Sequence, residues 1–142
     1  MKFIETKLKG SYVIKIDKLT DKRGFFGRTF DINEFKKMKL TTKFVQSNLS
    51  LTKKKGTIRG LHYQKHPYGE VKFYRCTKGK FYHVMIDLRR SSSTYKQWNG
   101  IELTEDNHIM TYVPKGFANG IQSLENNSEI IYHSSQFYNP KF

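Results

Sequence analysis

Short runs of β-forming residues, each followed by a cluster of turn-forming residues, recur along this chain and limit the folds that it can adopt. Turn-forming clusters occur at residues 21–24, 78–80, 99–100 and 114–116, where Gly, Pro, Asn and Asp interrupt the β pattern. Short strands at this spacing are typical of a β-sandwich or a barrel. We therefore expect an all-β fold whose strands include residues 12–16, 44–46, 71–76, 81–88, 109–113 and 130–133.

One short helix is predicted near residues 31–38. Asp31 can act as the N-cap, because its carboxylate can accept hydrogen bonds from backbone N–H groups of the first turn. Glu34, three residues later, completes an approximate capping box.

The predicted strand over residues 81–88 has two different faces, because successive side chains of a strand point to opposite sides. One face is uniformly bulky and suits a core between two sheets, whereas the other mixes polar and apolar groups. We expect the core face to carry Tyr82, Val84, Ile86 and Leu88, and a pocket-lining or wet face to carry Phe81, His83, Met85 and Asp87.

Length and composition fit one domain over residues 1–142. The net charge of +14 requires a polyanionic partner to be considered. However, the basic residues are dispersed, and the densest run, residues 53–55, precedes Gly56 and reads as a solvated turn. No apolar run approaches the roughly 18 residues of a membrane span, and the N-terminus lacks the apolar stretch of a signal peptide. We expect a cytoplasmic protein that binds neither nucleic acid nor membranes. Cys76 is the sole cysteine, so no intrachain disulfide can form.

The sequence Arg-Gly-Leu-His-Tyr-Gln at residues 59–64, followed by Lys72, carries the clearest chemical signal. It combines a guanidinium, an imidazole and an ammonium within predicted β-structure. These groups can bind a phosphorylated substrate, remove a carbon-bound proton and stabilise the resulting enolate. His62, His66 and Glu70 recur at four-residue intervals, but Pro67 and Gly69 argue against the helix that would align them. We expect no metal and no other cofactor.

Further motifs accompany this stretch: Arg-Gly-Phe-Phe at residues 23–26, Gln-Ser-Asn at 46–48, Pro-Lys-Gly-Phe-Ala-Asn-Gly at 114–120, and Tyr132 with Tyr138. In order and spacing, from about residue 3 to residue 140, the chain resembles the dTDP-4-dehydrorhamnose 3,5-epimerase family of nucleotide-sugar enzymes. The resemblance implies a cupin-type jelly roll (double-stranded β-helix). It also implies a homodimer in which an N-terminal strand crosses to the neighbouring subunit and brings residues 23–26 to its site.

The resemblance implies a catalytic role for three residues. His62 is the expected base, Lys72 faces the developing oxyanion, and Tyr132 is the acid on the opposite face of the sugar. The expected substrate is a nucleotide-diphosphate sugar with a 4-keto-6-deoxy ring, epimerised at C3, C5 or both during cell-surface or spore polysaccharide synthesis. The expected substrate-binding residues are Arg23, Phe26, Arg28, Gln46, Asn48, Arg59, Asn119 and Tyr138.

The chain departs from the family pattern at several of these places. Arg28 stands where the family has Glu, Ser47 and His83 each replace an Asp, and Asn119 replaces a His. An aspartate that orients the histidine base lies in a C-terminal region of the family that residues 1–142 do not reach. Two other functions therefore stay open: a non-catalytic nucleotide-sugar binding protein, and a 3,4-ketoisomerase. The carboxylates that could replace the aspartate beside His62 are Glu70, Asp87 and Glu125.

Overall fold

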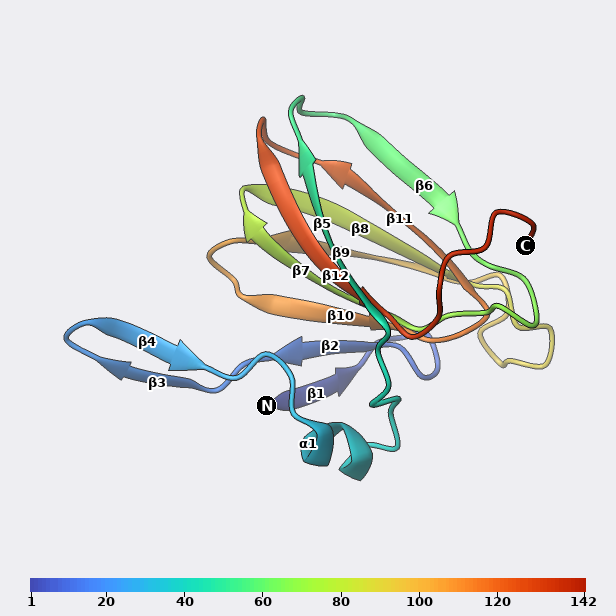
Figure 1. Ribbon diagram of the computed structural model, residues 1–142, viewed down its shortest axis with the longest axis horizontal. Helices are drawn as coiled ribbons and strands as arrows, with labels where there is room; N and C mark the ends of the chain where they lie inside the picture. The colour runs from blue at the N-terminus through green and yellow to red at the C-terminus, as the bar shows by residue number, and fades with distance from the viewer.

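Two antiparallel β-sheets face each other in the computed structural model, which describes residues 1–142 (Figure 1). The six-stranded sheet has the order β1-β2-β10-β7-β12-β5, and the four-stranded sheet has the order β6-β11-β8-β9. Between β6 and β12 the chain passes repeatedly from one sheet to the other, which confirms the predicted all-β jelly roll. The elements are β1 (Lys2–Glu5), β2 (Tyr12–Lys15), β3 (Lys18–Asp21), β4 (Gly24–Gly27), α1 (Ile32–Lys37), β5 (Gln46–Thr52), β6 (Ile58–His62), β7 (Lys72–Lys78), β8 (Lys80–Asp87), β9 (Trp98–Thr104), β10 (Ile109–Val113), β11 (Phe117–Ser123) and β12 (Ser128–Ser134).

The predicted helix is present, and Asp31 is its N-cap. The Asp31 carboxylate accepts hydrogen bonds from the backbone N–H groups of Asn33 and Glu34 at 2.8 and 3.2 Å. The Glu34 side chain does not close the capping box. It accepts a hydrogen bond from the N-terminal amino group of Met1 at 2.6 Å and thereby connects the helix to the start of β1.

The main core lies between the two sheets, and its composition corrects our prediction for residues 81–88. Phe81, His83, Met85 and Asp87 are the fully buried face of β8, whereas the alternate side chains are only half-buried on the outer face. The prediction was wrong because it counted apolar groups and did not allow for internal partners. Asp87 accepts hydrogen bonds from Arg89, Ser92 and Thr94, so a carboxylate can be buried on this face.

A second apolar cluster covers the other side of the six-stranded sheet. Phe35 of α1 is fully buried against Phe73 of β7, with ring centroids 5.5 Å apart in an edge-to-face arrangement. Phe73 and Tyr74 are neighbours in β7 and therefore point to opposite faces. Because Phe73 is held in this cluster, Tyr74 points into the space between the sheets.

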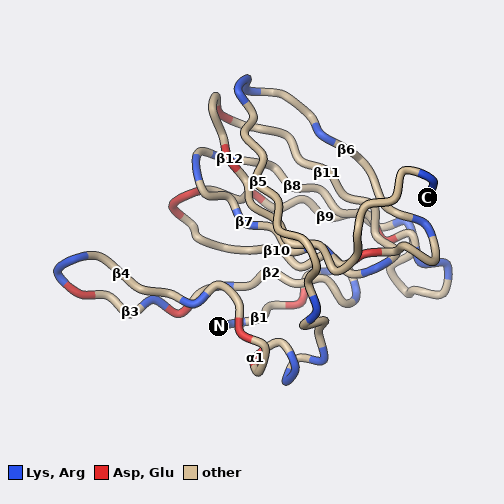
Figure 2. Tube along the Cα trace, in the orientation of Figure 1, with Lys and Arg blue, Asp and Glu red and all other residues tan.

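Strands β3 and β4 form a separate hairpin that extends away from the two sheets (Figure 1). Lys and Arg residues are spread over the loops, the hairpin and α1 and do not gather along one strand (Figure 2). No helix is long and apolar enough to cross a membrane.

Candidate active site

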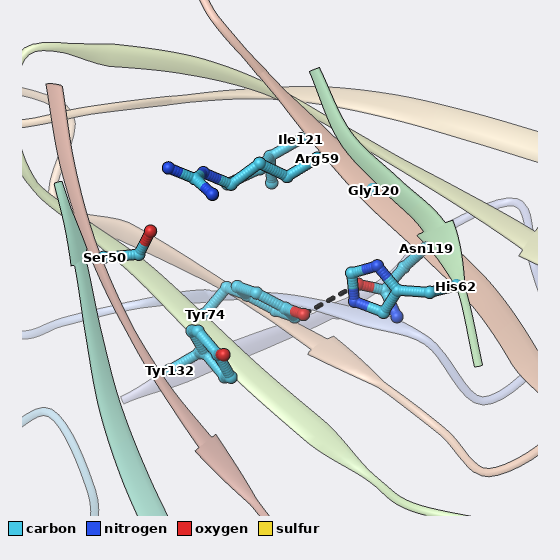
Figure 3. A pocket seen from close by; sticks show the side chains of 8 residues that line it. All are labelled: Ser50, Arg59, His62, Tyr74, Asn119, Gly120, Ile121 and Tyr132. Carbon is cyan, nitrogen blue, oxygen red and sulfur yellow. Dashed lines mark hydrogen bonds between the residues drawn. The ribbon is translucent and has the colours of Figure 1, made fainter. Parts of the chain in front are cut away.

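A pocket between the two sheets collects most of the chemically useful side chains (Figure 3). One wall belongs to β6 and β11 of the four-stranded sheet, and the other belongs to β5, β7 and β12 of the six-stranded sheet. The residues that line it are Ser50, Arg59, His62, Tyr74, Asn119, Gly120, Ile121 and Tyr132.

Two glycines let β6 and β11 approach closely enough to form the first wall. A Cβ atom at Gly60 would lie 2.8 Å from the carbonyl oxygen of Asn119 and 3.1 Å from Nδ1 of His62. A Cβ atom at Gly120 would lie 2.9 Å from the carbonyl oxygen of Arg59. Gly60 also has φ +111°, which side chains rarely tolerate. The glycine of Arg-Gly-Leu-His therefore sets the position of His62 beside Asn119.

His62 ends β6, and its exposed ring projects over the pocket (Figure 3). Its surroundings hold its pKa below the ordinary value of 6.5, mainly because nearby protein removes part of its hydration and also because of the positive charge of Lys72. The charge of Glu70 acts in the opposite direction and raises the pKa. A neutral imidazole near pH 7 can accept a proton, as a general base must.

Lys72 and Glu70 form a buried ion pair next to the pocket. Their charged atoms are 2.9 Å apart, and the two side chains are only 9% and 10% exposed. Lys72 Nζ also lies 5.7 Å from the ring centre of Tyr132. The structure thus places the predicted ammonium close to the predicted acid and brings a carboxylate with it.

Among the three carboxylates considered for His62, Glu70 is the one whose charge acts on that ring. Asp87 is engaged elsewhere, since Arg89, Ser92 and Thr94 all donate to it. Burial raises the pKa of Asp87, but these hydrogen bonds outweigh it and hold the pKa well below its usual range. Glu125 is exposed in the turn before β12.

Two tyrosines stack on the second wall. The rings of Tyr74 and Tyr132 have centroids 5.1 Å apart and an interplanar angle of 26°. Burial raises the pKa of both phenols, and the charge of Glu70 raises both further. Both therefore remain protonated near neutral pH, and Tyr132 can act as a proton donor.

His83 lies fully buried behind the pocket and makes the fold sensitive to acid. Burial lowers its pKa to about 4, from 6.5 in an exposed histidine. Between these values the unfolded chain binds a proton that the folded chain excludes, so stability should fall as pH decreases from about 6.5 to about 4. This shift corresponds to a loss on the order of 3 kcal/mol. Urea unfolding at several pH values should show this slope, and His83→Gln should flatten it. An equal slope in the variant would contradict this interpretation.

The structure does not bring every predicted residue to the pocket. Arg23 and Phe26 lie on the exposed β3–β4 hairpin, and Arg28 follows it and pairs with Asp31. Gln46 accepts a hydrogen bond from the backbone N–H of Tyr138, whose side chain is exposed. The predicted residues outside the pocket lining are Arg23, Phe26, Arg28, Gln46, Asn48 and Tyr138; Lys72 is adjacent to it.

The prediction missed Ser50, Tyr74, Gly120 and Ile121. Period-2 alternation could have found two of them, because Ser50 follows Asn48 by two residues in β5 and Tyr74 follows Lys72 by two in β7. Each therefore shares a strand face with a residue that the resemblance had identified.

The profile of the family described as dTDP-4-dehydrorhamnose 3,5-epimerase matches residues 5–142. The chain belongs to this epimerase family. The dTDP-4-dehydrorhamnose 3,5-epimerase of Methanothermobacter thermautotrophicus is 36% identical over 142 residues, which are 99% of this chain and 75% of that protein. The dTDP-4-dehydrorhamnose 3,5-epimerase of Shigella flexneri is 35% identical over 139 residues, 97% of this chain and 76% of that protein. The resemblance read from the sequence motifs is confirmed.

Solved structures of 3,5-epimerases share this fold. The Bacillus anthracis enzyme, with TDP and PPi bound, superposes with a TM-score of 0.94 at 37% identity and covers 99% of this chain and 80% of its own. The dTDP-6-deoxy-D-glucose-3,5-epimerase of Legionella pneumophila, in complex with dTDP-4-keto-L-rhamnose, superposes with a TM-score of 0.91 at 32% identity. The match covers 99% of this chain and 74% of that one.

Proposed function

We propose that this chain epimerises a nucleotide-linked 4-keto-6-deoxy sugar at C3, C5 or both, through an enolate. The observation that carries the proposal is the placement of His62 and Tyr132 on opposite walls of one pocket. Inversion at a carbon requires proton removal from one face and proton delivery to the other. A base on one sheet and an acid on the other meet that requirement.

In the proposed reaction, neutral His62 removes the proton from the carbon next to the ketone. The electrons move toward the ketone oxygen, where the buried ammonium of Lys72 stabilises the negative charge. Tyr132 then gives its phenolic proton to the opposite face of the same carbon. Solvent afterwards returns a proton to Tyr132 and removes one from His62.

Arg59 is proposed to hold the diphosphate, because its guanidinium lines the same pocket and can bind phosphate oxygens in pairs. Its Nε donates to Thr52 Oγ1 at 3.3 Å, which orients the side chain along β5. Support for a dTDP-linked substrate comes from the relatives solved with TDP or with dTDP-4-keto-L-rhamnose.

Glu70 is proposed to tune His62 and Lys72. Its carboxylate offsets the charge of Lys72 and raises the pKa of His62. Glu70→Gln should therefore lower the pKa of His62 and move the acid limb of the kcat/KM profile to lower pH. Glu102→Gln is the matched control, because Glu102 pairs with Lys80 at 3.5 Å on the surface. An acid limb that stays in place in Glu70→Gln would exclude this role.

We further propose a homodimer in which the β3–β4 hairpin reaches the partner's pocket. The Arg23 side chain is 83% exposed and Phe26 is 65% exposed, and the hairpin projects away from its own sheets (Figure 1). Mixing inactive His62→Ala with inactive Arg23→Ala should restore activity, because each mixed dimer contains one intact site. No recovery on mixing folded dimers would contradict strand exchange.

The function is tested by incubating the protein with dTDP-4-keto-6-deoxyglucose in deuterated water. We expect deuterium at C3, C5 or both, detected by NMR and mass spectrometry. Calorimetric binding of the nucleotide sugar without any deuterium incorporation would select the non-catalytic binding protein. Isomerisation that moves the ketone to C3 would select the ketoisomerase.

A further inference from the structure

A buried cluster of polar side chains lies behind the pocket and consists of Tyr74, Asn119 and His83. The three residues come from β7, β11 and β8, and each is at most 3% exposed. The Tyr74 hydroxyl donates to Asn119 Oδ1 at 2.8 Å. The Tyr74 and His83 rings have centroids 4.5 Å apart, and the Asn119 side chain raises the pKa of His83.

The residue of this cluster farthest from the pocket is His83, a neutral histidine. His83 Nδ1 lies 2.8 Å from Thr111 Oγ1, and its Nε2 has no hydrogen-bond partner of good geometry. Because burial lowers its pKa, His83 stays neutral through the pH range in which an imidazole base works. The cluster therefore acts as a fixed set of dipoles and not as a second acid or base.

The hydrogen-bond direction limits what Tyr74 can offer to a ligand. A phenol has one proton, and Tyr74 gives that proton to Asn119. The remaining capacity of its oxygen is acceptance. Tyr74 and His62 both line the pocket, and the Tyr74 hydroxyl is directed toward Asn119 (Figure 3). A ligand group that reaches Tyr74 in the pocket can therefore donate a hydrogen bond to this oxygen but cannot accept one from it.

We propose that Tyr74 is a specificity-determining residue that accepts a hydrogen bond from a ring hydroxyl of the sugar, with Asn119 positioning its phenol. This proposal rests on the proposed function and deepens it. It assigns the substrate to sugars with a free hydroxyl at C2 or C3, the ring positions that carry hydroxyls in a 4-keto-6-deoxyhexose. A buried site that hydrogen-bonds a substrate hydroxyl binds the deoxy analogue more weakly, because the protein atom that pairs with the hydroxyl is then left without a partner.

Binding and exchange are compared for the wild type and Tyr74→Phe, which keeps the ring and its stacking on Tyr132. The ligands for calorimetry are dTDP-6-deoxyglucose and its 2-deoxy and 3-deoxy analogues. The ligands for exchange are dTDP-4-keto-6-deoxyglucose and its 2-deoxy and 3-deoxy analogues. The wild type should prefer the hydroxylated sugar over one analogue by about 3- to 10-fold, the range expected for a single hydrogen bond. Tyr74→Phe should remove that preference and leave the affinity for free dTDP unchanged.

Tyr112→Phe is the matched control. Tyr112 is also buried, and its hydroxyl accepts a hydrogen bond from the backbone N–H of Thr41 at 3.2 Å, but it belongs to the cluster around Phe35. It should change thermal stability and leave the sugar preference intact. In addition, Asn119→Ala combined with Tyr74→Phe should relax the preference no further than Tyr74→Phe alone, because Asn119 acts through the phenol.

A wild type that binds hydroxylated and deoxy sugars equally would overturn the proposal, as would a Tyr74→Phe variant that keeps the preference. Additive effects of the two substitutions would overturn the positioning role of Asn119. The calorimetric comparison needs no turnover, so it distinguishes failure of this inference from failure of the proposed epimerase activity.

Discussion

His62→Ala should reduce deuterium incorporation into the sugar by about 10²- to 10⁴-fold, the usual contribution of a positioned general base. The physical reason is that the pocket lining contains no other histidine. His83 cannot substitute, because it is fully buried behind Asn119 and its pKa is about 4.

The affinity of His62→Ala for dTDP should stay close to that of the wild type, because Arg59 and not His62 is assigned to the diphosphate. His66→Ala is the matched control, since His66 lies in the exposed loop that follows β6 and outside this pocket. Exchange at the wild-type rate in folded His62→Ala would remove His62 from the mechanism.

Tyr132→Phe should slow epimerisation by about 10²-fold or more while slowing proton exchange much less. The variant keeps the aromatic ring that stacks on Tyr74 and faces the Lys72 ammonium, so the pocket shape is retained. His62 can still remove the proton and return a solvent deuteron to the same face. The variant loses the delivery of a proton to the opposite face of the sugar carbon.

Both rates are read from one NMR time course in deuterated water, which follows exchange in the starting sugar and appearance of its epimer. Tyr95→Phe serves as the control, because Tyr95 lies in the connection between β8 and β9 and does not line the pocket. Equal reductions in exchange and epimerisation would contradict the division of roles between His62 and Tyr132.

The sequence motifs predicted part of the pocket lining but not its surroundings. The pocket lining includes four residues that the motifs had identified: Arg59, His62, Asn119 and Tyr132. Lys72, which follows the first motif, lies beside the pocket. Tyr74 was missed because no motif includes it, although its two-residue spacing from Lys72 in β7 already placed both side chains on one face. The packing of its neighbour Phe73 against α1 agrees with that placement.

Other predictions failed or remain open for physical reasons. The face of β8 that mixes polar and apolar residues is buried, because Arg89, Ser92 and Thr94 donate to Asp87. In addition, His83 Nδ1 pairs with Thr111, which is distant in sequence. Arg23 and Phe26 lie on a hairpin outside the sheets, so their predicted role depends on a partner chain. Glu70 was one of three candidates, and only the fold shows that its charge acts on His62.

A crystal structure with a bound dTDP-sugar tests the central claim most directly. We predict the sugar ring between the His62 imidazole and the Tyr132 hydroxyl, its ketone oxygen toward Lys72, and its diphosphate on Arg59. A ring bound with both residues on the same side, or in a different cavity, would contradict the account.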